Sequence, residues 1–151
     1  MTNKIFVDLI GFMGYALMSY DYYNHRSDIY SNIILIGYIL LTLSHIPKTD
    51  EHNKKEHESN TMKLGHIIVS SYYGYKILSH KIDLHSILGL IANSLFLTKY
   101  KKYSNILLLI FYTETIFRGQ GNMAIYIVSL HYLALLYKNN YNKISSIISS
   151  T

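Results

Sequence analysis

Several segments combine histidine with carboxylate side chains at spacings that could hold a metal ion. Asp21 and His25 are four residues apart, so on a helix they would share one face. The segment HKIDLH adds His80, Asp83 and His85. Imidazole and carboxylate are suitable ligands for zinc or iron. These five residues could converge on a zinc or iron ion. The interpretation we favour is that they are ordinary loop and interface residues, and the metal site is the alternative.

Haem is the other cofactor that the histidines could bind. His66 and His80 are 14 residues apart, which on a continuous helix places them near one face and about 21 Å from each other. Membrane b-type cytochromes pair such histidines with an equivalent pair on a second helix, and this sequence has no second pair. One haem between His131 and a single partner is the remaining haem hypothesis. A histidine in its position more often bonds a neighbouring helix or joins a proton path.

Four ionisable residues lie within or beside apolar segments, where charge is costly and therefore often functional. We predict Asp8, Glu114, Arg118 and His131 as candidates for a solute or proton path. Asp8 and Glu114 also have simpler interpretations. Asp8 is close to the start of its segment and would face water, while Glu114 and Arg118 are four residues apart and would pair on a helix.

The composition limits the class of protein. Half of the 151 residues are apolar and 15% are charged, against about 25% charged residues in typical soluble domains. The absence of cysteine excludes disulfides, thiolate metal sites and cysteine nucleophiles. The net charge is +5, but the sequence has no basic stripe with interleaved aromatic residues. Nucleic acid is therefore not an expected partner.

Apolar runs divide the chain into six segments, and each predicts a helix. They are residues 5–20, 29–46, 64–78, 84–98, 105–117 and 123–137, with a hydrophilic loop at 47–63. We predict one domain over residues 1–151, an all-α polytopic transmembrane bundle of six short spans embedded in a lipid bilayer. The segments are shorter than the roughly 20 residues of a typical span. A soluble helical bundle and a four-span topology are therefore the alternatives.

The lysines predict an orientation for such a bundle. Most of them fall at the N-terminus, in the 47–63 loop, in the loop after residue 98 and near the C-terminus. The positive-inside rule then places both termini on the cytoplasmic side of the membrane. The oligomeric state is not predicted, and a homo-oligomer stays open.

Short repeated motifs suggest two related halves. YSNI occurs at residues 30–33 and again at 103–106, and Ile-Val-Ser with a following tyrosine occurs at 68–73 and at 127–132. Leu9 with Gly14 matches Leu84 with Gly89 in the same way. In order, these matches pair the first three spans with the last three. Two inverted three-helix halves, a plan that many transporters use, are the resulting hypothesis.

These observations favour a non-enzymatic function, either passage of a small solute or ion or a structural role in a membrane. The alternative is a membrane-embedded enzyme that depends on a metal or haem and uses the histidine–aspartate cluster. The leading hypothesis needs no cofactor, whereas the alternative needs zinc, iron or haem.

Overall fold

The computed structural model describes residues 2–25, 29–46, 54–79 and 82–148. Within these ranges the chain forms six α-helices, one short π-helical segment and no β-strand. Each predicted apolar segment overlaps one helix, which confirms the all-α prediction. The elements are α1 (Thr2–His25), α2 (Ile29–Ser44), α3 (Lys54–Ser79), α4 (Leu84–Phe96), α5 (Lys101–Thr115), η1 (Ile116–Gln120) and α6 (Met123–Ile148).

Local side-chain chemistry sets several helix ends. Asp83 caps α4 by accepting a hydrogen bond of 2.9 Å from the backbone N–H of Ser86. Asn122 caps α6 through its side-chain oxygen, which accepts from the N–H of Ile125 at 3.1 Å. Gly119 has a φ of +72° in η1, a conformation that favours glycine. The predicted 47–63 loop differs from the structure, because α3 already begins at Lys54 and residues 47–53 lie outside the described ranges.

The prediction of membrane spans is wrong. Among the described residues, no helix combines the length and the apolar character that crossing a membrane requires. The apolar helices α2 and α4 have only 16 and 13 residues, whereas a span needs roughly 20. The longer α1 and α3 include charged residues such as Asp21 and Lys76.

Three further predictions depended on these spans and are wrong for the same reason. They are the multi-pass topology, the integral membrane location and the cytoplasmic position of both termini. Tyrosine side chains suit a membrane interface as well as a protein core. In the structure, Tyr15, Tyr38, Tyr73, Tyr112 and Tyr132 are instead buried in the protein core.

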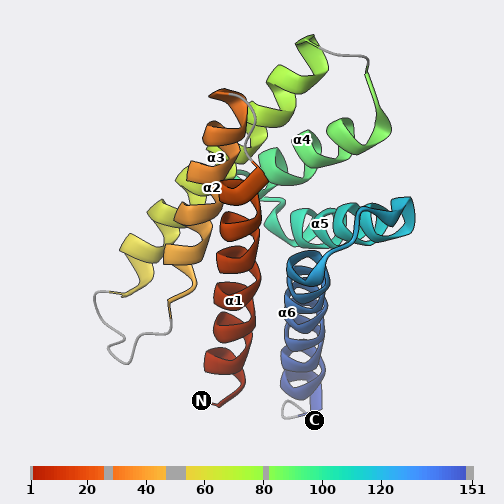
Figure 1. The fold of residues 1–151 in the computed structure, drawn as a ribbon. Coiled ribbons are helices and arrows are strands. Elements are labelled where there is room, and N and C mark those ends of the chain that lie inside the picture. Colours follow the sequence, from red (N-terminus) through yellow and green to blue (C-terminus); the bar gives the residue numbers. More distant parts are fainter. Residues whose placement is uncertain (1, 26–28, 47–53, 80–81, 149–151) are drawn as a thin grey trace.

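The helices pack in chain order and then close on themselves. Each helix contacts the next one along the chain, and α6 also returns to pack against α1. Figure 1 shows that the start of α1 and the end of α6 lie at the same end of the bundle. This closure gives all six helices an inner face, and the core extends across all of them, with Ala92 as the contribution of α4.

Two glycines allow matching close contacts between helices. A Cβ on Gly14 of α1 would lie 2.6 Å from Val128 Cγ2 of α6, and a Cβ on Gly37 of α2 would lie 2.7 Å from Val69 Cγ2 of α3. Each glycine is followed by a buried tyrosine, Tyr15 or Tyr38. The Ile-Val-Ser motifs of α3 and α6 are therefore equivalent in packing, because the valine of each motif contacts the glycine of a Gly-Tyr pair on the neighbouring helix.

The motif likeness does not follow the order that the inverted halves require. In the helix contacts, α1 and α2 have equivalent roles, because each presents its Gly-Tyr pair to an Ile-Val-Ser motif. The repeated sequence motifs instead paired the first predicted span with the fourth. The two YSNI copies also differ in environment, since Ser104 and Asn105 are buried while Ser31 and Asn32 are only partly buried. With no membrane span among the described helices, the transporter-like inverted repeat loses its basis.

Candidate functional site

A pocket of about 240 Å³ lies between the helices, and all six contribute to its wall. It is placed toward the ends of α1, α3 and α5 and the starts of α4 and α6. Pockets for small molecules typically measure about 300–1,000 Å³, so this one suits a small ligand. Its lining consists of Met18, Asp21, Tyr22, Tyr38, Tyr72, Tyr73, Lys76, His85, Phe111, Tyr112, Thr115, Gln120, Asn122 and Ile125.

Aromatic rings form much of this wall and contact one another. The ring centroids of Tyr73 and Phe111 are 5.4 Å apart with a near-perpendicular arrangement, and those of Phe111 and Tyr112 are 5.0 Å apart. Tyr22 and Tyr38 also line the pocket, with ring centroids 5.3 Å apart. Contacting aromatic pairs of this kind add to the stability that burial provides.

Buried tyrosines form a cluster that reaches the aromatic wall. Tyr132 of α6 and Tyr15 of α1 are hydrogen bonded. Tyr38, Tyr73 and Tyr112 lie close enough to one another to affect each other's pKa, and Tyr38 and Tyr112 affect that of Tyr15 as well. The cluster therefore extends from a buried pair at the α1–α6 contact to three tyrosines that line the pocket.

These hydroxyls stay protonated at neutral pH. Burial raises the pKa of Tyr15, Tyr38, Tyr73, Tyr112 and Tyr132 above the ordinary tyrosine value, and neighbouring tyrosines raise it further for most of them. Burial likewise raises the pKa of Tyr22. The pocket therefore offers neutral O–H groups, each of which can donate one hydrogen bond and accept others.

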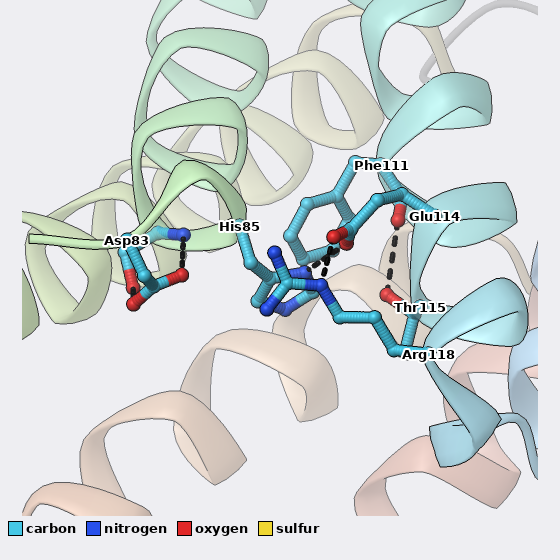
Figure 2. Close-up of polar contacts among 7 residues, drawn as sticks. Asp83, His85, Phe111, Glu114, Thr115 and Arg118 are labelled. Carbon is cyan, nitrogen blue, oxygen red and sulfur yellow. Dashed lines mark hydrogen bonds and ion pairs between the residues drawn. The ribbon is translucent and has the colours of Figure 1, made fainter.

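His85 brings an imidazole to this pocket and is held by a carboxylate. Its Nδ1 lies 2.7 Å from Glu114 Oε2, and the other carboxylate oxygen of Glu114 pairs with Arg118. In Figure 2, dashed lines join the Glu114 carboxylate to His85 of α4 and to Arg118 of η1. An ionised carboxylate can only accept, so Nδ1–H is the donor. The Nε2 atom of His85 is then the ring nitrogen that can meet another partner.

Local structure fixes the position of His85. Asp83 caps the first turn of α4 with both carboxylate oxygens, which accept from the backbone N–H and the hydroxyl of Ser86. Burial raises the pKa of the Asp83 carboxyl, but the Ser86 hydrogen bonds and the charge of Lys76 outweigh this effect and leave it lowered. The ring of Phe111 stacks on the His85 imidazole with centroids 4.3 Å apart.

The charged groups of the pocket differ in how fully they are paired. Asp21 accepts a hydrogen bond from Asn122 Nδ2 at 2.8 Å, and its other oxygen lies 3.2 Å from His25 Nδ1. Lys76 makes no ion pair with any residue that the structure describes. The ammonium group of Lys76 is therefore the charge most free to meet a ligand.

The five predicted metal ligands do not form one centre in the described ranges. Asp21 and His25 lie together as expected, but Asp83 serves as a helix cap and His85 pairs with Glu114. His80 lies outside the described residues. Across the described ranges, no group of three or more histidine, aspartate or glutamate side chains has the arrangement to hold a metal ion.

The four path candidates are spread over the bundle. Asp8 is partly buried on α1 and acts electrostatically on His45. Glu114 and Arg118 form the expected four-residue pair, and the sequence gave no sign of the additional contact to His85. The His131 side chain donates from Nδ1 to the backbone oxygen of Val7 at 2.9 Å and so links α6 to α1.

His131 has a histidine neighbour, but their arrangement does not suit a haem. The ring centroids of His45 and His131 are 4.7 Å apart in an edge-to-face contact, which leaves no space for a porphyrin between them. A Cβ on Gly11 would lie 2.4 Å from His45 Cδ2, so the backbone of α1 closes the remaining side. Burial lowers the pKa of both imidazoles, to about 3 for His131, so the pair is neutral.

Sequence reasoning missed the tyrosines that build the pocket. A signal was present, because GYALMS at residues 14–19 and GYILLT at 37–42 share a pattern that places a tyrosine after a small residue. A close helix contact at each glycine would direct the next side chain toward the core. Tyrosine composition alone does not separate this arrangement from a membrane interface, because the side chain has an apolar body and a polar tip.

No family model, curated protein or solved structure matches this chain. Its class therefore rests on the fold and the pocket themselves. The described chain is an all-α bundle of six helices around a tyrosine-lined pocket.

Proposed function

We propose that this protein binds a small aromatic molecule that carries polar groups at its edge. The observation that supports this function is the pocket of about 240 Å³, with six aromatic lining residues and contributions from every helix. At about 30 Å³ per water molecule, that volume equals about eight waters. A single substituted aromatic ring is the size of ligand that it suits.

The chemistry of the wall favours this ligand class. The rings of Tyr73 and Phe111 meet nearly perpendicular, and a ligand ring can join such a wall through stacked or edge-to-face contacts. Tyr38, Tyr73 and Tyr112 also line the pocket, and each carries a hydroxyl that can donate and accept hydrogen bonds. A mostly aromatic pocket with a few convergent polar groups is the usual form of a small-molecule site.

Of the functions expected from the sequence, the pocket supports the part that concerns a small solute, as binding of that solute. Passage of the solute across a membrane is not supported, since no described helix has the length and apolar character of a span. The metal or haem enzyme finds less support, because Asp83 and His85 have other partners and His45 and His131 contact each other directly.

Ligand-observed NMR tests the proposal with phenol, benzamide and cyclohexanol as probes. We expect saturation transfer from the protein to phenol and benzamide, and little transfer to cyclohexanol, which cannot stack. The variant Ile125→Phe places a larger side chain in the pocket wall and should abolish the transfer. Leu130→Phe makes the same kind of change on the same helix, at a residue that is 51% exposed, and should preserve it.

Circular dichroism of both variants shows that the comparison concerns folded protein. Equal transfer to the two aromatic probes in Ile125→Phe and the wild type would place binding elsewhere and contradict the proposed function. Absence of transfer to every probe in the wild type would contradict it as well.

A further inference from the structure

We propose that the pocket binds an amino acid with an aromatic side chain, whose ring lies among the buried aromatic residues, whose carboxylate meets Lys76 and whose ammonium group meets Asp21. This inference rests on the proposed function and specifies the ligand class of the same site. It draws on three features: the separation of apolar and charged residues in the pocket wall, the ion pairing of Lys76, and the hydrogen-bonding capacity of Asp21.

The pocket wall has a buried, mostly aromatic part and a more exposed charged part. The buried lining residues are Met18, Tyr38, Tyr73, Phe111, Tyr112 and Thr115. Asp21 and Lys76 are the lining residues that carry a carboxylate and an ammonium group, and both are only partly buried. Ionic groups are costly to remove from water. A ligand is therefore expected to place its ring inward and its charged groups toward the solvent.

Lys76 brings a positive charge to the pocket that no described residue pairs with. It makes no ion pair within the described ranges, either with Asp21 or with any other carboxylate. Its charge acts on Asp83, but both carboxylate oxygens of Asp83 accept hydrogen bonds from Ser86 in the cap of α4. A ligand carboxylate is therefore the complementary partner for the ammonium group of Lys76.

Asp21 is a positioned carboxylate that can still accept a hydrogen bond. Its Oδ2 accepts from Asn122 Nδ2 at 2.8 Å, and its Oδ1 lies 3.2 Å from His25 Nδ1. An ionised carboxylate has about four acceptor positions, so these two contacts orient the group without filling it. The Asp21 side chain is 41% exposed, which leaves the remaining positions accessible. A ligand ammonium group offers three N–H donors for them.

The two charges belong to different helices and stay apart. Asp21 lies near the end of α1 and Lys76 near the end of α3, and the side chains line one pocket without pairing with each other. A ligand with a single charge is attracted by one of these residues and repelled by the other. A ligand with both charges can be attracted by both, which favours it over its singly charged relatives. An aromatic amino acid combines these two charges with one ring at neutral pH.

Isothermal titration calorimetry of the full chain with three probes tests this inference. L-Phenylalanine carries both charges, 3-phenylpropionate lacks the ammonium group, and 2-phenylethylamine lacks the carboxylate. We expect phenylalanine to bind about tenfold more tightly than either of the other probes, which is the effect of one hydrogen bond to a charged group.

Two variants should respond differently to the singly charged probes. Lys76→Met keeps an unbranched side chain without the charge, and it should lose about tenfold in affinity for phenylalanine and 3-phenylpropionate but not for 2-phenylethylamine. Asp21→Asn keeps an oxygen that can accept from Asn122, and it should lose about tenfold for phenylalanine and 2-phenylethylamine but not for 3-phenylpropionate. Lys102→Met removes an exposed lysine outside the pocket lining and should bind all three probes as the wild type does.

Each variant is expected to retain one probe, so loss of the fold cannot produce the predicted pattern. Equal affinity of the wild type for phenylalanine and for either singly charged probe would show that one of the two charges is not recognised, and would overturn the inference. An equal loss of all three probes in Lys76→Met or Asp21→Asn would assign that residue a structural role and would overturn it as well.

The inference and the proposed function can fail separately. Saturation transfer to phenol and benzamide without binding of phenylalanine would overturn the inference and leave the proposed function standing. Failure of the wild type to bind phenol, benzamide and all three charged probes would overturn both together.

Discussion

Asn122 donates a hydrogen bond from Nδ2 to Asp21 Oδ2 over 2.8 Å, although the two residues are 101 positions apart in the sequence. The same Asn122 accepts the N–H of Ile125 and caps α6. One amide therefore starts a helix and fastens it to the end of α1. Because both residues line the pocket, this contact also helps to hold the pocket wall.

Removing this amide should lower the free energy of unfolding. Asn122→Ala loses the helix cap and the bond to a carboxylate, and we expect a cost of about 2 kcal/mol. Asn122→Ser keeps a capping hydroxyl but cannot reach Asp21 in the same way, so it should cost less than half as much. Urea denaturation measures both variants. Equal losses would show that the helix cap contributes little, and an Asn122→Ser variant as stable as the wild type would show that the contact with Asp21 contributes little.

The Tyr15–Tyr132 hydrogen bond should show energetic coupling. Each single change to phenylalanine leaves the other hydroxyl without its partner in a dry core, at a cost of about 1 kcal/mol or more. A double-mutant cycle of unfolding free energies should give a coupling of about 1 kcal/mol. Additive single effects would contradict the bond.

The glycines predict opposite effects for the same substitution. Gly14→Ala and Gly37→Ala would drive a methyl group to 2.6 Å and 2.7 Å from a valine of the facing helix. We expect each to destabilise the fold by about 1–3 kcal/mol through overpacking. Gly74→Ala is the matched control, since its methyl group would be 3.8 Å from the nearest atom, Leu90 Cδ1. It should stabilise α3 by up to about 1 kcal/mol, measured as a rise in Tm.

His66 predicts a loss of stability in mild acid. Burial lowers its pKa to about 3 in the folded state, while the unfolded value is 6.5. As the pH falls below about 6.5, the unfolded chain binds a proton that the folded chain does not, so unfolding becomes easier. The loss continues down to about pH 3 and reaches about 2 kcal/mol at pH 5.

A variant isolates this contribution from those of the other histidines. His66→Gln cannot gain a proton, yet its amide can still donate to Asn93 Oδ1, which the imidazole contacts at 2.8 Å. The variant should lose about 2 kcal/mol less than the wild type between pH 7.5 and pH 5, by urea denaturation at each pH. The remaining dependence comes partly from His45 and His131, whose pKa values burial also lowers. Identical pH dependence in the two proteins would contradict a buried neutral His66.

The positions of the helices could be predicted from the sequence, because they depend on local patterns. Runs such as IILIGYILLTL form a helix wherever they pack, and the six observed helices overlap the six predicted segments. The Glu114–Arg118 pair was predicted for the same reason, since a four-residue spacing on a helix brings two side chains together in any environment.

The surroundings of these helices could not be predicted in the same way. Tyrosine has a ring that suits a core and a hydroxyl that suits an interface, so its local sequence fits both a membrane belt and a packed interior. The structure places Tyr38, Tyr73 and Tyr112 inside the bundle, where they pack together and line the pocket.

The candidate site depends on contacts between residues that are distant in the chain. His85 and Glu114 are 29 residues apart, and Tyr15 and Tyr132 are 117 apart. A local pattern determines which face of a helix is apolar, but not which helix will cover that face. The sequence by itself therefore determined six helices and the histidine, carboxylate and tyrosine side chains that they carry. The packing of α6 against α1, and of α4 against α5, decided which of these side chains contact one another, because only close packing brings such distant groups within hydrogen-bonding distance.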